Sequence, residues 1–202
     1  MSNNNMPFKG LKICLTGVTG EEESKCKKLI EFLGGKLSRD FSKDCYCLLV
    51  KKVGSKKYQV AYDINIPCLT IQWLLDCYDQ KTLLNYNTHK VKPFEGLSFV
   101  ISGYTPEERY ILQQLIINNK GINNNKLTQT NCTHLIALTS NSDKYKAAKY
   151  WNNIHIVNKK WIYDCIERGR WILEVPYMVL PEHIYPPVDE AKARLIEAKK
   201  QQ

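Results

Sequence analysis

Residue types that bind phosphate gather in the second half of the chain. Ser102 and Gly103 follow an apolar run, Arg109 comes seven residues after Ser102, and Lys144 begins another amphipathic stretch. A hydroxyl followed by glycine offers a phosphate one side-chain donor and one unobstructed N–H, and the start of a following helix attracts the same anion. Arginine adds a charged fork and lysine a point charge. The set predicts an anion site; the alternative is a simple Ser-Gly turn beside solvated cations.

The first half of the chain carries a less complete set. Thr16, Gly17 and Lys57 match, but the position seven residues after Thr16 is Glu23, the last of three consecutive glutamates. Carboxylates at the start of a helix stabilise that helix, yet they repel an incoming phosphate. We therefore expect weaker phosphate binding here unless a nearby cation compensates. The candidates for that cation are Lys25, Lys27 and Lys56.

Both sets belong to an internal repeat, which is the first pattern to seek in a chain of this length. Five segments recur in the same order at offsets of about 86 to 88 residues. The first-copy segments are 8–11, 15–17, 45–49, 57–58 and 73–77, and their matches are 94–97, 101–103, 132–136, 144–145 and 161–165. The sequence therefore predicts two similar domains in tandem.

Each copy alternates short apolar runs with longer amphipathic ones, which is typical of an α/β domain with a four-stranded parallel sheet flanked by three helices. In the first copy the runs predict strands at 12–15, 35–37, 46–50 and 67–69, and helices at 21–33, 56–63 and 71–78. In the second copy they predict strands at 98–101, 122–127, 134–138 and 155–157, and helices at 106–118, 144–151 and 160–168.

Several single residues support this division. Thr105, Pro106 and Glu108 form a helix start, with a threonine cap, a proline at the first helical position and a glutamate that reaches back. Trp73 and Trp161 lie among apolar neighbours at helical spacing, and we expect both in the domain cores. Two further lysines of the second copy either flank a peptide groove or are ordinary exposed cations: Lys146 and Lys149.

Composition narrows the class of protein. Of 202 residues, 29 are basic and 20 acidic, so the net charge is +9. This excess has two equally good interpretations: a polyanionic partner, or a solvated surface that is simply rich in lysine. Eight cysteines form no C-x-x-C pair and four histidines lack ligand spacing, so we expect buried free thiols and neither metal nor cofactor. Without long apolar segments or nucleotide-binding glycine motifs, the sequence indicates a soluble intracellular protein that is no enzyme.

The order of elements, the Thr/Ser-Gly pair after the first strand and the tryptophan of the last helix resemble the BRCT (BRCA1 carboxy-terminal) domain family over residues 8–180, in two copies. Within that family, Val53–Tyr58 and Asp143–Lys149 are most similar to the amino-terminal BRCT repeats of the topoisomerase II-binding protein and the Dpb11 scaffold group. The expected domains are a disordered start (1–7), a first domain (8–81), a linker (82–93), a second domain (94–180) and a tail with helical potential (181–202).

The resemblance implies a non-catalytic, nuclear scaffold module that recognises phospho-Ser/Thr motifs in DNA replication-initiation or DNA-damage checkpoint partners, such as a replication-initiation factor or the tail of a checkpoint clamp. Family pockets place the hydroxyl and the helical arginine seven residues apart, as Ser102 and Arg109 are. Two alternatives stay open. One is direct DNA binding through the basic surface, and the other is a purely structural interaction domain with vestigial pockets. The resemblance also implies a role connected with DNA repair, and it implies no membrane partner.

Overall fold

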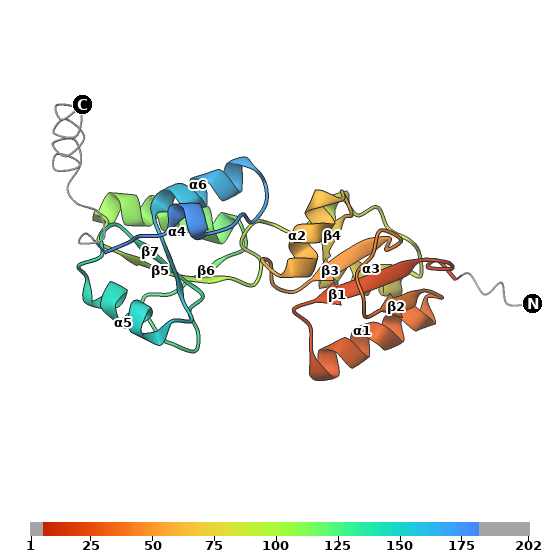
Figure 1. Ribbon diagram of the computed structural model, residues 1–202. Coiled ribbons are helices and arrows are strands. Elements are labelled where there is room, and N and C mark those ends of the chain that lie inside the picture. Colours follow the sequence, from red (N-terminus) through yellow and green to blue (C-terminus); the bar gives the residue numbers. More distant parts are fainter. Residues whose placement is uncertain (1–5, 182–202) are drawn as a thin grey trace, which may run out of the picture. The chain divides into compact units, whose positions relative to one another are not determined.

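The computed structural model describes residues 6–181 of the chain (Figure 1). The expected disordered start and tail therefore lie almost wholly outside the described residues. Contacts divide the chain into two compact units. Among the described residues, the first comprises 6–97, Ile116–Ile122 and Asp164–Leu173, and the second comprises Ser98–Leu115, Asn123–Tyr163 and 174–181. Because two later segments cluster with the first unit, the units do not coincide with the expected domains, whose bounds stay a prediction.

The first unit contains a four-stranded parallel sheet in the order β2-β1-β3-β4. Helices α1 and α3 pack together, while α2 contacts β3 and β4. Its elements are β1 (Lys12–Thr16), α1 (Gly20–Phe32), β2 (Lys36–Ser38), β3 (Cys47–Val50), α2 (Lys56–Asp63), β4 (Cys68–Thr70), α3 (Ile71–Gln80) and the short 3₁₀ helix η1 (Asn87–His89).

The second sheet repeats this order as β6-β5-β7-β8, and α5 contacts β7 and β8. The elements of the second repeat are β5 (Ser98–Ser102), α4 (Pro106–Asn118), β6 (Ile122–Asn123), β7 (His134–Ala137), α5 (Asp143–Trp151), β8 (His155–Val157), α6 (Lys159–Glu167) and the 3₁₀ helix η2 (Val175–Tyr177). Two four-stranded parallel sheets confirm the predicted fold class. They also give the two repeats the same element order.

The parallel arrangement brings the ends of distant segments to one edge. Thr16 pairs with Val50 at the carboxyl ends of β1 and β3, and Ser102 pairs with Ala137 at the carboxyl ends of β5 and β7. The loop that leaves β1 and the loop that enters α2 therefore start side by side, and the second unit repeats this with α5. Loops at this edge are the usual place for ligands in open parallel sheets.

Large aromatic side chains fill the cores. Trp73 and Trp161 are both fully buried, as predicted. Trp73 stacks on Phe8 with ring centroids 5.2 Å apart, and its Nε1 donates to the carbonyl of Leu84. Trp161 stacks instead on His134, 4.8 Å away. All eight cysteines are buried free thiols, which also confirms the prediction made from their apolar neighbours.

The predicted helix start is confirmed in atomic detail, since Glu108 N donates to Thr105 Oγ1 and Thr105 N donates to Glu108 Oε2, each at 3.3 Å. One prediction of extent is wrong. Strand β6 ends at Asn123 rather than continuing to residue 127. The reason is the run of asparagines, whose side chains compete for backbone and side-chain partners; Asn124 Nδ2 donates to Ser98 Oγ. Within residues 6–181, each helix is too short or too polar to cross a membrane.

Candidate functional site

The predicted hydroxyl and glycine lie at the carboxyl end of the first strand in each unit. Thr16 closes β1 and Ser102 closes β5, and both side chains are largely buried. Gly17 and Gly103 follow with φ of +72° and +86°, in the left-handed region that favours glycine. A Cβ on Gly17 would lie 3.0 Å from Lys52 N, and one on Gly103 would lie 3.1 Å from Leu138 Cβ. Both positions thus require glycine for conformation and for space.

A serine that was not predicted ties each hydroxyl to the next helix. Thr16 Oγ1 donates to Ser55 Oγ at 2.7 Å, and Ser102 Oγ donates to Ser142 Oγ at 3.1 Å. Ser55 and Ser142 also cap α2 and α5, because each accepts from the backbone N–H three residues on. Since each serine oxygen already accepts two hydrogen bonds, its own proton is free to point toward a ligand.

The second site takes its cations from two helices. Arg109 lies in the first turns of α4, and its Nη1 donates to the carbonyl of Ile101 at 2.7 Å, which places the guanidinium beside the end of β5. Lys144 is half-buried in the first turn of α5, two residues after the capping Ser142. The structure thus positions Ser102, Gly103 and Arg109 at one strand end, with Lys144 in the helix that Ser142 ties to it.

One of the two glutamates in the first turn of α4 is neutralised internally. Glu108 Oε1 accepts from Lys159 Nζ at 2.5 Å. The bond from Lys159, aided by the backbone N–H of Thr105, lowers the pKa of Glu108 below its ordinary value. This carboxylate is therefore committed to a structural ion pair. It adds little repulsion toward an anion at the end of β5.

The first site is a cavity of about 500 Å³. The cavity brings together the predicted Thr16, Gly17 and Lys57, and it also contains the opposing Glu23. One cation that sequence reasoning missed lines it as well, Arg39, in the loop after β2. The full lining is Leu15, Thr16, Gly17, Val18, Glu23, Leu37, Ser38, Arg39 and Lys57.

Lys57 reaches across the end of the sheet. Its Nζ donates to the carbonyls of Arg39 at 2.6 Å and Leu15 at 3.3 Å, and lies 3.5 Å from Cys14 Sγ. Burial raises the pKa of the Cys14 thiol, although the Lys57 ammonium opposes the shift. The sulfur therefore stays protonated and leaves the lysine charge uncompensated. The Leu15 carbonyl corresponds to the Ile101 carbonyl that Arg109 contacts in the second unit.

The glutamates at the start of α1 have different surroundings. Glu22 pairs with Lys51, whereas Glu23 has no ion pair within residues 6–181. None of the three lysines proposed to compensate for Glu23 lines the cavity. Lys25 is exposed on α1, Lys27 lies 3.8 Å from Glu31, and Lys56 is exposed at the first position of α2.

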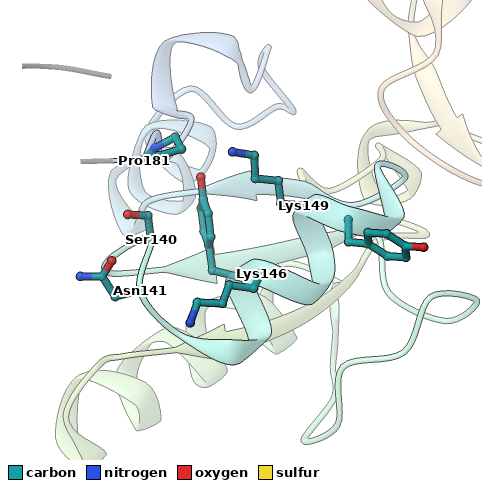
Figure 2. A pocket seen from close by; sticks show the side chains of 7 residues that line it. Ser140, Asn141, Lys146, Lys149 and Pro181 are labelled. Carbon is teal, nitrogen blue, oxygen red and sulfur yellow. The ribbon is translucent and has the colours of Figure 1, made fainter. Parts of the chain in front are cut away.

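A groove of about 710 Å³ follows α5 beyond the second site (Figure 2). Lys146 and Lys149 of the helix line it, together with Ser140 and Asn141 of the preceding loop and Pro181. Lys146 is weakly paired with Asp143 at 4.0 Å, where both side chains are solvated. Both lysines thus line the groove and remain available to a partner. The remaining lining residues are Tyr145 and Tyr150.

Comparison with known protein families gives two matches along the chain. The family model of the BRCA1 C Terminus (BRCT) domain matches residues 3–78 and 89–166. Among curated proteins, the S-M checkpoint control protein rad4 of Schizosaccharomyces pombe is 26% identical over 183 residues, and human Protein ECT2 is 22% identical over 177. These alignments cover 86% and 83% of this chain but only 28% and 19% of the relatives, which are far longer than the region matched.

Solved structures share the fold. The crystal structure of Rad4 BRCT1,2 in complex with a Crb2 phosphopeptide superimposes with a TM-score of 0.71, covering 86% of this chain and 100% of that one, at 23% identity. The structure of the same Rad4 region with a Mdb1 phosphopeptide gives a TM-score of 0.72. At this level of identity the likeness extends to the tandem fold, which matches the two sheets described above.

Proposed function

Because the chain belongs to the BRCT domain family, we propose that it is a non-catalytic module that binds phosphorylated serine or threonine motifs in partner proteins. One observation carries the proposal. In each unit a hydroxyl, a positive-φ glycine and a cation share the end of the first strand, next to the start of a helix. A turn with only a local role requires the glycine but not the neighbouring cation.

The donors of the second site suit a phosphate monoester. Gly103 N–H and the linked hydroxyls of Ser102 and Ser142, which keep one proton for a ligand, donate to phosphate oxygens, while the start of α4 faces the same edge. Arg109 and Lys144 supply two positive charges for a phosphate that carries nearly two negative ones. The side chain of Arg109 is held by the Ile101 carbonyl, so part of its ordering cost is met before the ligand arrives.

The groove along α5 gives the flanking peptide a path away from the phosphate. The helix begins at the site with Lys144 and continues past the groove with Lys146 and Lys149. The two groove lysines, Lys146 and Lys149, favour acidic residues on that side of the phosphorylated residue. We therefore expect the preferred motifs to combine one phosphate with neighbouring Asp or Glu.

Similar proteins support a cellular role of the same kind. Rad4 BRCT1,2 has been crystallised with phosphopeptides of Crb2 and of Mdb1, and rad4 is a checkpoint control protein. By analogy, we propose that this chain assembles nuclear complexes of DNA replication initiation or of the damage checkpoint. The partners would be phosphorylated proteins such as an initiation factor or a clamp tail.

A phosphopeptide array tests the binding activity directly. The full chain is applied to peptides with phosphoserine or phosphothreonine in acidic, neutral and basic contexts, before and after phosphatase treatment. We expect binding that phosphatase abolishes and that acidic flanks strengthen. Equal binding to treated and untreated arrays would refute the proposal.

Titration of the chain with a DNA duplex at increasing salt concentration allows its DNA binding to be compared with its phosphopeptide binding. A phosphopeptide engages one phosphate and loses affinity moderately with salt, whereas a module that coats DNA loses affinity steeply because many counterions are released. If duplex DNA binds more tightly than every phosphopeptide at physiological salt, the basic surface has a different ligand and the proposed function fails.

A further inference from the structure

The first site lacks the arginine that the second site takes from its helix. In α4 that residue is Arg109, and the matching position in α1 is Glu23. The first cavity nevertheless has an arginine in its lining, Arg39, from the loop after β2. We propose that Arg39 is the arginine ligand of a phosphorylated residue in the first site, an inference that rests on the proposed function.

Sheet topology explains how a residue so distant in sequence reaches the site. Strand β2 is the parallel neighbour of β1, with Cys14 opposite Ser38, so both strands end at the same edge. Arg39 directly follows β2, just as Gly17 directly follows β1. Arg39 therefore lines the site from the β2 side of the sheet, whereas Lys57 reaches it from α2.

Lys57 fixes the position of this loop. Its ammonium donates to the backbone carbonyl of Arg39 at 2.6 Å, and this contact joins the loop after β2 to the start of α2. The Arg39 side chain is exposed, and its guanidinium has no ion pair within the described part of the chain. A phosphate between Thr16 and Lys57 would thus meet a second cation that is free to close on it.

The start of α1 adds a further difference between the sites. Thr19 makes no side-chain cap, so the first N–H groups of α1 have no side-chain acceptor, whereas α4 uses its own capping box. With Lys57, Arg39 and Glu23 around it, the first cavity carries one net positive charge. The second site has two, from Arg109 and Lys144. The inference therefore includes an affinity order, with the first site the weaker of the two.

Site-resolved NMR separates the two sites in one sample. The full chain, labelled with ¹⁵N, is titrated with the probe acetyl-Ala-phosphoserine-Ala-amide, and the amides of Gly17 and Gly103 report the first and second sites. The unphosphorylated tripeptide is the ligand control. We expect both amides to shift with the phosphorylated probe alone, Gly17 at the higher concentration.

Three variants then test Arg39 itself. Arg39→Gln should weaken the Gly17 titration about tenfold and leave that of Gly103 unchanged, since one charge-assisted hydrogen bond is lost. Lys43→Gln removes the same charge from an exposed position on the same loop and should change neither. Glu23→Gln should tighten the Gly17 titration severalfold, because a like charge is removed from the cavity.

Each remaining outcome has a definite meaning. If Gly103 shifts and Gly17 does not, or if Arg39→Gln titrates at Gly17 like wild type, the assignment of Arg39 is wrong while the proposed function stands. If Arg39→Gln and Lys43→Gln weaken the Gly17 titration equally, general charge rather than a ligand contact is responsible, and the assignment again fails. If neither glycine distinguishes the two tripeptides, both the proposed function and this inference are overturned.

Discussion

The two sites reach a similar arrangement with different residues. In the second unit an arginine from α4 contacts the carbonyl before the strand-end hydroxyl, and in the first unit a lysine from α2 contacts the equivalent carbonyl. Glu108 in α4 pairs with Lys159 and its counterpart Glu22 in α1 pairs with Lys51, whereas Glu23, at the position of Arg109, stays unpaired within residues 6–181. The serine that ties strand to helix is the same in both. The repeat thus preserves the scaffold of the site and varies its charges.

The largest expected effect tests whether the two cores are equivalent. Trp73→Ala and Trp161→Ala each remove a fully buried ring and should each destabilise the protein by about 3–5 kcal/mol. Thermal unfolding followed by tryptophan fluorescence and circular dichroism measures both. A cost below about 1 kcal/mol for either variant would show that its core does not depend on the ring.

The next effect separates the sites by charge. Lys144→Glu should weaken a phosphopeptide that occupies the second site about a hundredfold or more, because it removes a charge-assisted contact and adds repulsion. Lys57→Glu should weaken that peptide much less. Calorimetry with singly and doubly phosphorylated peptides measures the affinities of both variants. When the two sites bind one peptide chain, avidity makes the affinity of the doubly phosphorylated peptide sensitive to either substitution.

A charge-matched control completes this experiment. Lys9 is exposed and precedes β1, at the opposite end of the strand from Thr16, so Lys9→Glu should bind like wild type. If Lys57→Glu abolishes binding of every peptide while Lys144→Glu is harmless, the order of the two sites is reversed. Circular dichroism of each variant verifies that the fold is retained.

A smaller effect is expected on the pH dependence of stability, and it should differ between two histidine–carboxylate pairs. His89 Nε2 and Asp76 Oδ2 lie 2.7 Å apart and are partly buried in the first unit, and His134 Nε2 and Glu174 Oε1 lie 3.2 Å apart in the interior of the second. Burial alone would raise the pKa of Glu174, but hydrogen bonds from His134 and the backbone, with the charge of His155, outweigh it and lower the pKa. For Asp76, hydrogen bonds from Gln72 and then His89 lower the pKa.

The sign of the pH dependence follows from these shifts. A carboxylate with a lowered folded-state pKa contributes stability above its unfolded value, about 4, and loses it as pH falls through the folded value. The thermal unfolding midpoint should therefore decrease as the pH is lowered from 7 to 3. Glu174→Gln should reduce this decrease more than Asp76→Asn does, because the Glu174 pair is buried. An equal response from both variants would mean that burial does not distinguish the pairs.

The smallest effect should be identical in the two units. Ser55→Ala and Ser142→Ala each remove a helix cap and should each cost about 1 kcal/mol of stability, measured by chemical denaturation. Both should also loosen the strand-end hydroxyl that donates to the serine. Ser→Thr at the same positions retains a capping oxygen and should recover most of the loss.

Most of the fold could be predicted from the sequence because apolar periodicity and the repeat reinforce each other. An ambiguous run in one copy is resolved by its counterpart, and the element order of both sheets follows. The end of β6 could not be predicted this way, since asparagine side chains decide it through local hydrogen bonds. Propensity alone does not weigh those bonds against strand pairing.

The site was predictable only where its residues lie close to a motif. Ser55 and Ser142 carried a usable signal, a serine just before each predicted helix at the repeat offset of 87. Arg39 carried none, because its place in the cavity depends on β2 being the parallel neighbour of β1. The lysines chosen from sequence proximity instead lie outside the cavity, since helical geometry directs neighbours in sequence to different faces.

Parallel pairing also has a consequence for how the chain reaches its native state. Residue 13 pairs with residue 47, and residue 99 pairs with residue 134, so each sheet forms only after a long crossover has closed. Such contacts slow folding relative to a helical bundle of the same length. Two similar sheets on one chain also offer each strand a second, wrong neighbour during that search. Divergence between the repeats therefore aids correct assembly as well as giving each site its own charges.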